Sequence, residues 1–97
     1  MNMTGPQDNQ DIEQRIRSFI AANLLYSSDG FVYSDDASFL QEGMIDSLGV
    51  MELVEFVQSS FLVTVDQREV TPENFDSVGK LAAFVRRKLE ATKESRS

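Results

Sequence analysis

The residues best placed to do chemistry are an aspartate and a serine near the middle of the chain, Asp46 and Ser47. They belong to segment 43–48, which reads Gly-Met-Ile-Asp-Ser-Leu and runs directly into an apolar-periodic stretch that ends at Phe61. A serine becomes a nucleophile when a neighbouring base, usually a histidine, removes its proton. The 97 residues contain no His and no Cys. We therefore expect Ser47 to be a group on which another enzyme acts, and we do not expect the chain to be an enzyme.

The position of Ser47 at the start of a predicted helix leaves three interpretations to weigh. Asp46 is a good N-cap, and Ser47 would then occupy the first turn with its side chain exposed. As a capping pair alone, the two residues need no further function. As a catalytic nucleophile, Ser47 lacks a base. As a covalent attachment point, it would place a phosphodiester near the unpaired N–H groups and the positive dipole end of the helix.

The composition is typical of one small globular domain, with 41% apolar and 26% charged residues. The absence of Cys excludes disulfides, and the absence of both Cys and His excludes structural zinc. Asp29, Asp35 and Asp36 lack the spacing of a calcium-binding EF-hand, so we expect no metal site. No apolar run approaches the roughly 20 residues of a membrane span, and no signal peptide is visible. We expect a monomeric, cytoplasmic protein.

The net charge of −7 is unevenly distributed along the chain. Residues 29–76 contain 11 acidic residues and one basic residue, whereas residues 77–97 contain six basic and two acidic residues. An acidic middle repels phosphate backbones, so we do not expect nucleic acid as a partner. The same charge attracts proteins with basic patches. The alternative interpretation is that the acidity only keeps a small domain in solution.

The spacing of apolar residues predicts three long helices and one short helix. The first covers about 8–26, the second begins at Asp46 or Ser47 and ends near Phe61, a short helix follows Thr71, and the last follows Ser77. The expected buried stripes are Ile12, Ile16, Phe19, Ile20 and Leu24 in the first, Val50, Leu53, Val54, Val57 and Phe61 in the second, and Val78, Leu81, Ala82, Val85 and Leu89 in the last.

The long connection between the first two helices has no sustained period, and such connections are often functional. We expect it to lie across one end of the helices, with a helical turn near 36–40; a brief strand at 31–33 is the alternative. The predicted fold is all-α, a small four-helix bundle with three long helices, one short helix and a long first connection. We expect one domain from 8 to 90, between disordered tails at 1–7 and 91–97.

Segment 42–48, which reads Glu-Gly-Met-Ile-Asp-Ser-Leu, together with the following Met51-Glu52-Leu53, resembles the acyl carrier protein family. The signature of that family is Asp-Ser-Leu at the start of the second helix. The resemblance covers about 11–89. It includes the long first connection, the end of the second helix, the short helix at Thr71-Pro72 and the start of the last helix at Asp76-Ser77-Val78.

This resemblance implies that Ser47 receives a 4′-phosphopantetheine arm from coenzyme A, transferred by a separate magnesium-dependent phosphopantetheinyl transferase. It also implies that Asp46 assists this modification. Acyl or aminoacyl groups would then be carried as thioesters on the thiol of the arm. The implied partners are an acyl or amino acid ligase and acyltransferase-type enzymes with basic patches. These would dock on Leu48, Met51, Glu52 and Glu55.

The sequence also departs from the pattern of fatty-acid carriers. Gly49 stands where these carriers usually have an acidic residue, and Gln58, Ser59 and Ser60 replace further acids. These differences favour a specialised acyl or aminoacyl carrier that works with an adenylating ligase. One alternative is a housekeeping carrier of fatty-acid biosynthesis. Another, of a different class, is an unmodified acidic helical adaptor in which Ser47 is only part of a helix cap.

Overall fold

Four α-helices form the part of the chain that this computed structural model describes, residues 8–96, and no strand occurs there. The elements are α1 (Asp8–Asn23), α2 (Ser47–Phe61), the short 3-10 helix η2 (Gln67–Glu69), α3 (Pro72–Phe75) and α4 (Val78–Arg96). The predicted all-helical class, with three long helices and one short helix, is confirmed. The Cα radius of gyration of 13.5 Å matches a compact domain, for which about 13 Å is expected at this length.

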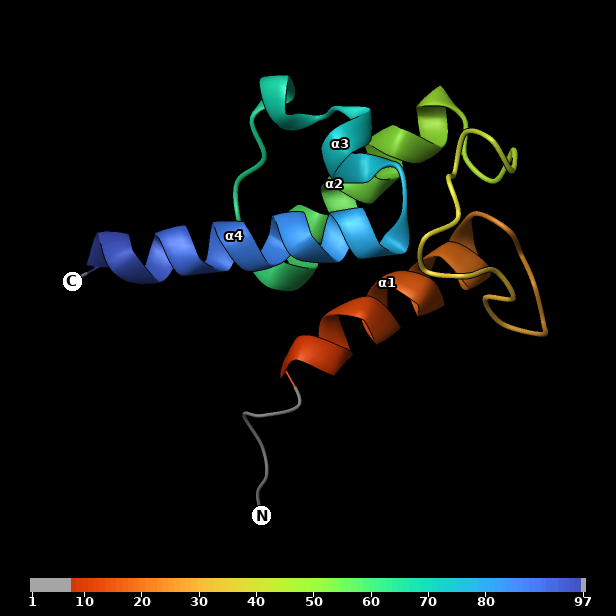
Figure 1. The fold of residues 1–97 in the computed structure, drawn as a ribbon, viewed down its shortest axis with the longest axis horizontal. Coiled ribbons are helices and arrows are strands. Elements are labelled where there is room, and N and C mark those ends of the chain that lie inside the picture. The colour runs from red at the N-terminus through yellow and green to blue at the C-terminus, as the bar shows by residue number, and fades with distance from the viewer. Residues whose placement is uncertain (1–7, 97) are drawn as a thin grey trace, which may run out of the picture.

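Helix α4 is the element against which the rest of the fold is assembled. It contacts α1, α2 and α3. Figure 1 shows α4 lying horizontally, with α3 above it, α1 below it and α2 behind it. None of the helices within residues 8–96 combines the length and the apolar content that a membrane span requires.

The core is one cluster of apolar side chains from all four helices and the first connection. Eight side chains in the helices are completely enclosed: Ile16, Ile20, Leu53, Val57, Val78, Leu81, Ala82 and Val85. All eight lie in the predicted stripes, because residues three or four apart share one face of a helix. Phe56 lies beside the stripe of α2 and packs inward, since its ring stacks on that of Phe19 in α1 with centroids 4.3 Å apart.

Two helix ends differ from the predicted ones. Helix α1 ends at Asn23, because Tyr26 adopts a left-handed backbone with φ of 53° and a wide turn closes from Ser27 N–H to the carbonyl of Ala21. Helix α4 continues to Arg96, past the boundary predicted at 90. Segment 90–96 contains good helix formers, and its basic residues favour a helix C-terminus. The expected tail at 1–7 and residue 97 lie outside the described residues.

The first connection, 24–46, contains turns at 35–36 and 39–43 and no strand at 31–33. The helical turn expected at 36–40 therefore lies a few residues later. Backbone bonds attach the connection to the start of α4: Phe39 N–H donates to the carbonyl of Asp76 at 2.8 Å, and Gly79 N–H donates to that of Asp35 at 2.9 Å. The Asp76 carboxylate also accepts from the Ser38 hydroxyl at 2.6 Å and from Leu40 N–H at 3.1 Å. These bonds place the buried ring of Phe39 in the core and lead the chain toward α2.

Candidate functional site

Asp46 and Ser47 form the N-terminal end of α2, as the sequence predicted. Asp46 is the N-cap, with φ of −105° and ψ of −169°, and its Oδ1 accepts a hydrogen bond from Gly49 N–H at 2.9 Å. Its backbone carbonyl accepts from Val50 N–H at 3.0 Å. An aspartate suits this position because its short side chain reaches back to an N–H group that the first turn of a helix leaves unpaired.

Ser47 is the first residue of α2, and it is exposed. Within residues 8–96 its hydroxyl forms no hydrogen bond with another residue. The N–H groups of Ser47 and Leu48 lie in the first turn, where the helix offers no carbonyl partner. A phosphate joined to Ser47 would therefore meet free N–H donors and the positive end of the helix dipole. The start of α2 therefore suits an anion, and the chain has no histidine that could activate the hydroxyl.

The four residues predicted to dock partners follow Ser47 along one side of α2. All four are exposed, with Leu48 at 74% and Met51 at 60%. They are Leu48, Met51, Glu52 and Glu55. The opposite side of the helix carries Leu53 and Val57, which are completely enclosed. The structure thus gathers the predicted residues on one surface, which we call the α2 face.

The α2 face is acidic and lies in a part of the sequence without basic residues. No Lys or Arg occurs between Arg17 and Arg68. Glu52 and Glu55 are exposed on the face itself, and Glu42 and Asp46 are exposed in the connection that leads to it. The charges of this face therefore have one sign, which favours a partner of the opposite sign.

An open groove of about 410 Å³ lies between the end of α1 and the start of α2, and both sequence neighbours of Ser47 line it. Its lining consists of Asn23, Leu24, Tyr26, Gly43, Met44, Ile45, Asp46, Leu48, Gly49 and Glu52. Tyr26 is 82% exposed. Asn23 and Tyr26 were not among the predicted site residues. The path of the first connection brings Asn23 and Tyr26 to the same groove as Asp46 and Leu48, and no spacing in the sequence indicates this.

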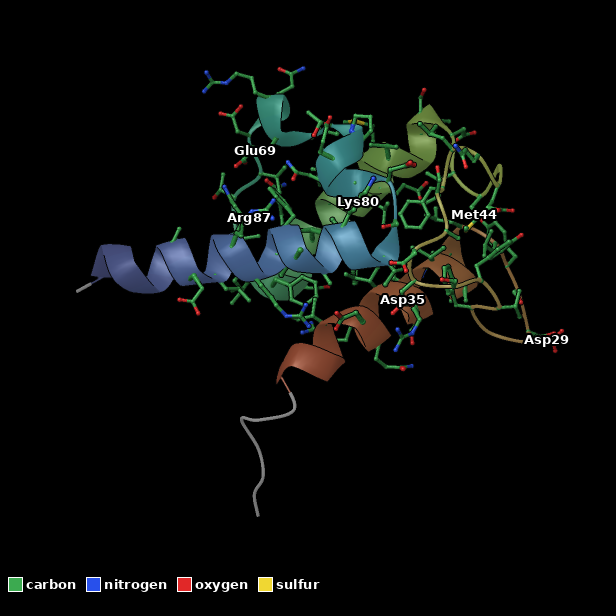
Figure 2. All side chains as sticks on the ribbon, in the orientation of Figure 1. Asp29, Asp35, Met44, Glu69, Lys80 and Arg87 are labelled. Carbon is green, nitrogen blue, oxygen red and sulfur yellow. The ribbon has the colours of Figure 1, made fainter. Side chains whose placement is uncertain are left out.

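A smaller, open apolar pocket of about 130 Å³ lies between the first connection, α2 and the segment around α3. It is lined by Phe39, Leu40, Ile45, Val50, Val70, Thr71, Pro72, Phe75 and Asp76. Ile45 lines both this pocket and the groove between α1 and α2. Met44, labelled in the first connection in Figure 2, is buried in the core.

Two basic side chains of α4 contact carboxylates of α1 and η2. Arg86 pairs with Glu13 at 2.6 Å, and Lys88 pairs with Glu69 at 3.0 Å. Figure 2 shows Glu69 over the side of α4 that carries Arg87.

Both paired glutamates have lowered pKa values. Burial disfavours the charged form of Glu13, but the hydrogen bond and charge of Arg86 outweigh it and hold the pKa below its ordinary value of 4.5. The pKa of Glu69 is lowered first by the N–H of Asp66, against burial, and then by Lys88. These carboxylates are therefore charged over most of the pH range.

The described residues contain no group of three or more His, Cys, Asp or Glu arranged to hold a metal ion. Asp35 lies where α1 and the start of α4 meet the first connection, and its carboxylate pairs with Arg17 at 2.7 Å. Figure 2 shows Asp29 apart from it, at the outer edge of the connection.

No protein-family model matches the chain, and a search of curated proteins finds no match either.

Proposed function

We propose that the protein is a discrete acyl carrier protein, modified at Ser47 with 4′-phosphopantetheine, that presents an acyl or aminoacyl thioester to partner enzymes. The observation that carries the proposal is the exposed hydroxyl of Ser47 directly after the capping carboxylate of Asp46. The structure has three long helices, one short helix and a long first connection, as expected of such carriers. We propose that these helices form the four-helix bundle of that class.

The residues at the start of α2 fit this cofactor. In the modification, the Ser47 oxygen bonds to the phosphorus that carries pantetheine in coenzyme A, adenosine 3′,5′-bisphosphate leaves, and the hydroxyl proton is released. The first-turn N–H groups of α2 then face a phosphodiester charge. Asp46, the residue directly before Ser47, holds the turn through the bond from Gly49 N–H to its carboxylate. The bound arm supplies a thiol, which the chain lacks because it contains no Cys.

The α2 face would be the docking surface for partner enzymes. Leu48 and Met51 supply exposed apolar area, and Glu52 and Glu55 supply negative charge next to it. Opposite charges on two partners speed their encounter and fix their relative orientation. The partners are therefore a phosphopantetheinyl transferase, an acyl or amino acid ligase and acyltransferase-type enzymes that carry basic patches.

Intact mass spectrometry tests the proposal directly. We expect wild-type protein, incubated with coenzyme A, Mg²⁺ and a broad-specificity phosphopantetheinyl transferase, to gain the mass of one phosphopantetheine group. We expect Ser47→Ala to gain nothing. Ser59→Ala is the matched control, because Ser59 is an exposed serine of the same helix whose hydroxyl donates to the carbonyl of Glu55 at 2.7 Å. An unmodified wild type, or a modified Ser47→Ala, would refute the proposal and favour the helical adaptor.

Within the carrier class, the α2 face favours a specialised acyl or aminoacyl carrier over a housekeeping carrier of fatty-acid biosynthesis. The face has two acidic residues, Glu52 and Glu55, and the positions of further acids are taken by Gly49, Gln58, Ser59 and Ser60. Mass spectrometry of the arm released from protein purified from its native cells would identify the cargo. A long fatty acyl chain on the arm would support the housekeeping alternative.

A further inference from the structure

Gly49, in the first turn of α2, has a neighbour that leaves no room for a side chain. A Cβ atom at this position would lie 2.6 Å from Cγ2 of Ile45, a separation that real Cβ atoms essentially never show. It would also lie 3.6 Å from Oδ1 of Asp46. Gly49 itself is buried, whereas the three residues before it are exposed. The space above the first turn is therefore occupied by Ile45.

Rotation of the Ile45 side chain does not relieve this contact, although Ile45 also lines the two open spaces described above. Its side chain is 6% exposed and belongs to the core cluster. Cγ2 is attached directly to the branched Cβ atom of Ile45, which would itself lie only 3.5 Å from a Cβ atom added at Gly49. Branching at Cβ restricts the first side-chain torsion, so a small rotation cannot clear the space. Any residue larger than glycine at position 49 would push on Ile45 and on the backbone that joins it to Asp46.

Gly49 is also the hydrogen-bond donor that orients the Asp46 carboxylate, through its N–H at 2.9 Å from Oδ1. Two contacts thus meet at one residue. The missing side chain admits Ile45 just before Asp46, and the N–H group holds Asp46 just before Ser47. Both contacts hold the two residues that precede Ser47, Ile45 and Asp46, in place against the first turn of α2.

We propose that Gly49 is a positioning residue for the modification of Ser47, and that it acts by admitting Ile45 against the first turn of α2. This inference rests on the proposed function. It also gives a reason why this chain has no acidic docking residue after Leu48, since an aspartate or glutamate at position 49 would displace Ile45. The recognition surface offered to partners therefore has its acidic residues further along, at Glu52 and Glu55.

The first test compares the rates at which variants accept phosphopantetheine from coenzyme A. We expect Gly49→Ala to lower kcat/KM for the carrier by about ten- to hundredfold, the scale of effect that a displacement of about 1 Å has on a positioned reaction. Gly79→Ala is the matched control, because Gly79 also lies in the first turn of a helix but its added Cβ would approach no atom closer than 3.4 Å. Far-ultraviolet circular dichroism should show full helix content in both variants, since alanine favours helices.

The second test is a rescue that only the proposed contact explains. Ile45→Leu removes the branch at Cβ and keeps the number of carbon atoms. It should therefore make room for the methyl group that Gly49→Ala introduces. Ile45→Val keeps the branch and should not. We expect the penalty of Gly49→Ala to shrink to within about threefold in the Ile45→Leu background and to persist in the Ile45→Val background, as a double-mutant cycle measures for residues in contact.

Amide hydrogen exchange at residue 49 gives a readout that does not depend on activity. We expect faster exchange in Gly49→Ala, because displacement of Ile45 weakens the bond to Asp46, and a return toward the wild-type rate with Ile45→Leu. Unchanged transfer and exchange rates in Gly49→Ala would overturn the inference while the proposed function stands. A wild type that accepts no phosphopantetheine would instead remove the proposed function, and this role of Gly49 with it.

Discussion

At the scale of single residues, Asp46 has two tasks that substitution can separate. Its Oδ1 caps α2 by accepting from Gly49 N–H, and it supplies a carboxylate on the residue directly before Ser47. Asparagine retains a side-chain oxygen that can cap the helix, whereas alanine does not. We expect Asp46→Ala to lower the free energy of unfolding by about 0.5–2 kcal/mol, and Asp46→Asn to leave it nearly unchanged. Urea denaturation followed by circular dichroism measures both values.

The same pair of variants separates capping from modification. We expect both Asp46→Asn and Asp46→Ala to slow phosphopantetheine transfer, because each removes the carboxylate next to Ser47. Asp29→Ala, an exposed aspartate of the first connection, is the control for loss of charge alone. If Asp46→Asn were modified as fast as wild type, the carboxylate would have only a capping role.

The sequence predicts this part of the site well because its interactions are local. Asp46 bonds to a residue three positions away, and capping preferences follow from residue type. Gly49 shows where such reasoning fails. From the sequence it is a glycine that weakens a helix by about 0.5–1 kcal/mol, and its contact with Cγ2 of Ile45 depends on a side-chain orientation that only the folded chain defines.

At the scale of elements, Asp76 fastens the first connection to the turn between α3 and α4. Its carboxylate accepts from the Ser38 hydroxyl at 2.6 Å and from Leu40 N–H at 3.1 Å. We expect Asp76→Ala to lower the free energy of unfolding by about 1–3 kcal/mol, because it leaves polar groups unpaired in a half-buried site. Urea denaturation measures the loss.

Hydrogen exchange locates the effect of Asp76→Ala in the chain. We expect the amides of segment 38–44 to exchange faster, while those in the middle of α1 stay protected, since the connection opens before the helices do. Ser38→Ala should also speed exchange in this segment, because it removes the bond to Asp76 and the bond from Gln41 N–H to the Ser38 hydroxyl, while Leu40 N–H keeps its bond to Asp76. Equal acceleration in α1 would mean that Asp76 supports the whole fold and not this connection.

Helices were predictable at this scale, and the connection was not. Apolar residues three or four apart mark the buried faces of α1, α2 and α4, and Pro72 after Thr71 marks the start of α3. The connection depends on bonds between residues far apart in sequence, such as Ser38 and Asp76, so no local period reveals it. The end of α1 was misplaced for a related reason, since Tyr26 is apolar enough to extend the pattern but adopts a left-handed backbone.

At the scale of the whole molecule, acidic and basic groups are separated. The α2 face carries the exposed carboxylates of Glu52 and Glu55, whereas the basic side chains Arg86 and Lys88 of α4 are paired with carboxylates of α1 and η2. The pairs neutralise charge where α4 meets α1 and η2. Within the part of the chain that the structure describes, the acidic α2 face has no such pairs, so it keeps its negative electrostatic potential. A partner with a basic patch is therefore directed toward the start of α2 and not toward α4.

These pairs predict how stability depends on pH. The pKa values of Glu13 and Glu69 are lowered from 4.5 in the folded protein. The unfolded chain therefore binds protons at a higher pH than the folded chain does. The stabilisation from each glutamate is complete above its unfolded pKa and is lost as the pH falls through the lowered folded value. We expect the free energy of unfolding, measured by urea denaturation, to decline as the pH falls below about 4.5.

Removing the two ion pairs by mutation shows how much of this loss of unfolding free energy at low pH they cause. We expect the double variant Glu13→Gln/Glu69→Gln to be less stable than wild type at pH 7, and the difference to shrink as the pH falls, because acid removes the same charges from wild type. Glu42→Gln/Glu73→Gln is the matched control, since both of these glutamates are exposed. Parallel curves for wild type and the Glu13/Glu69 variant would show that the two ion pairs do not hold α4 against its neighbours.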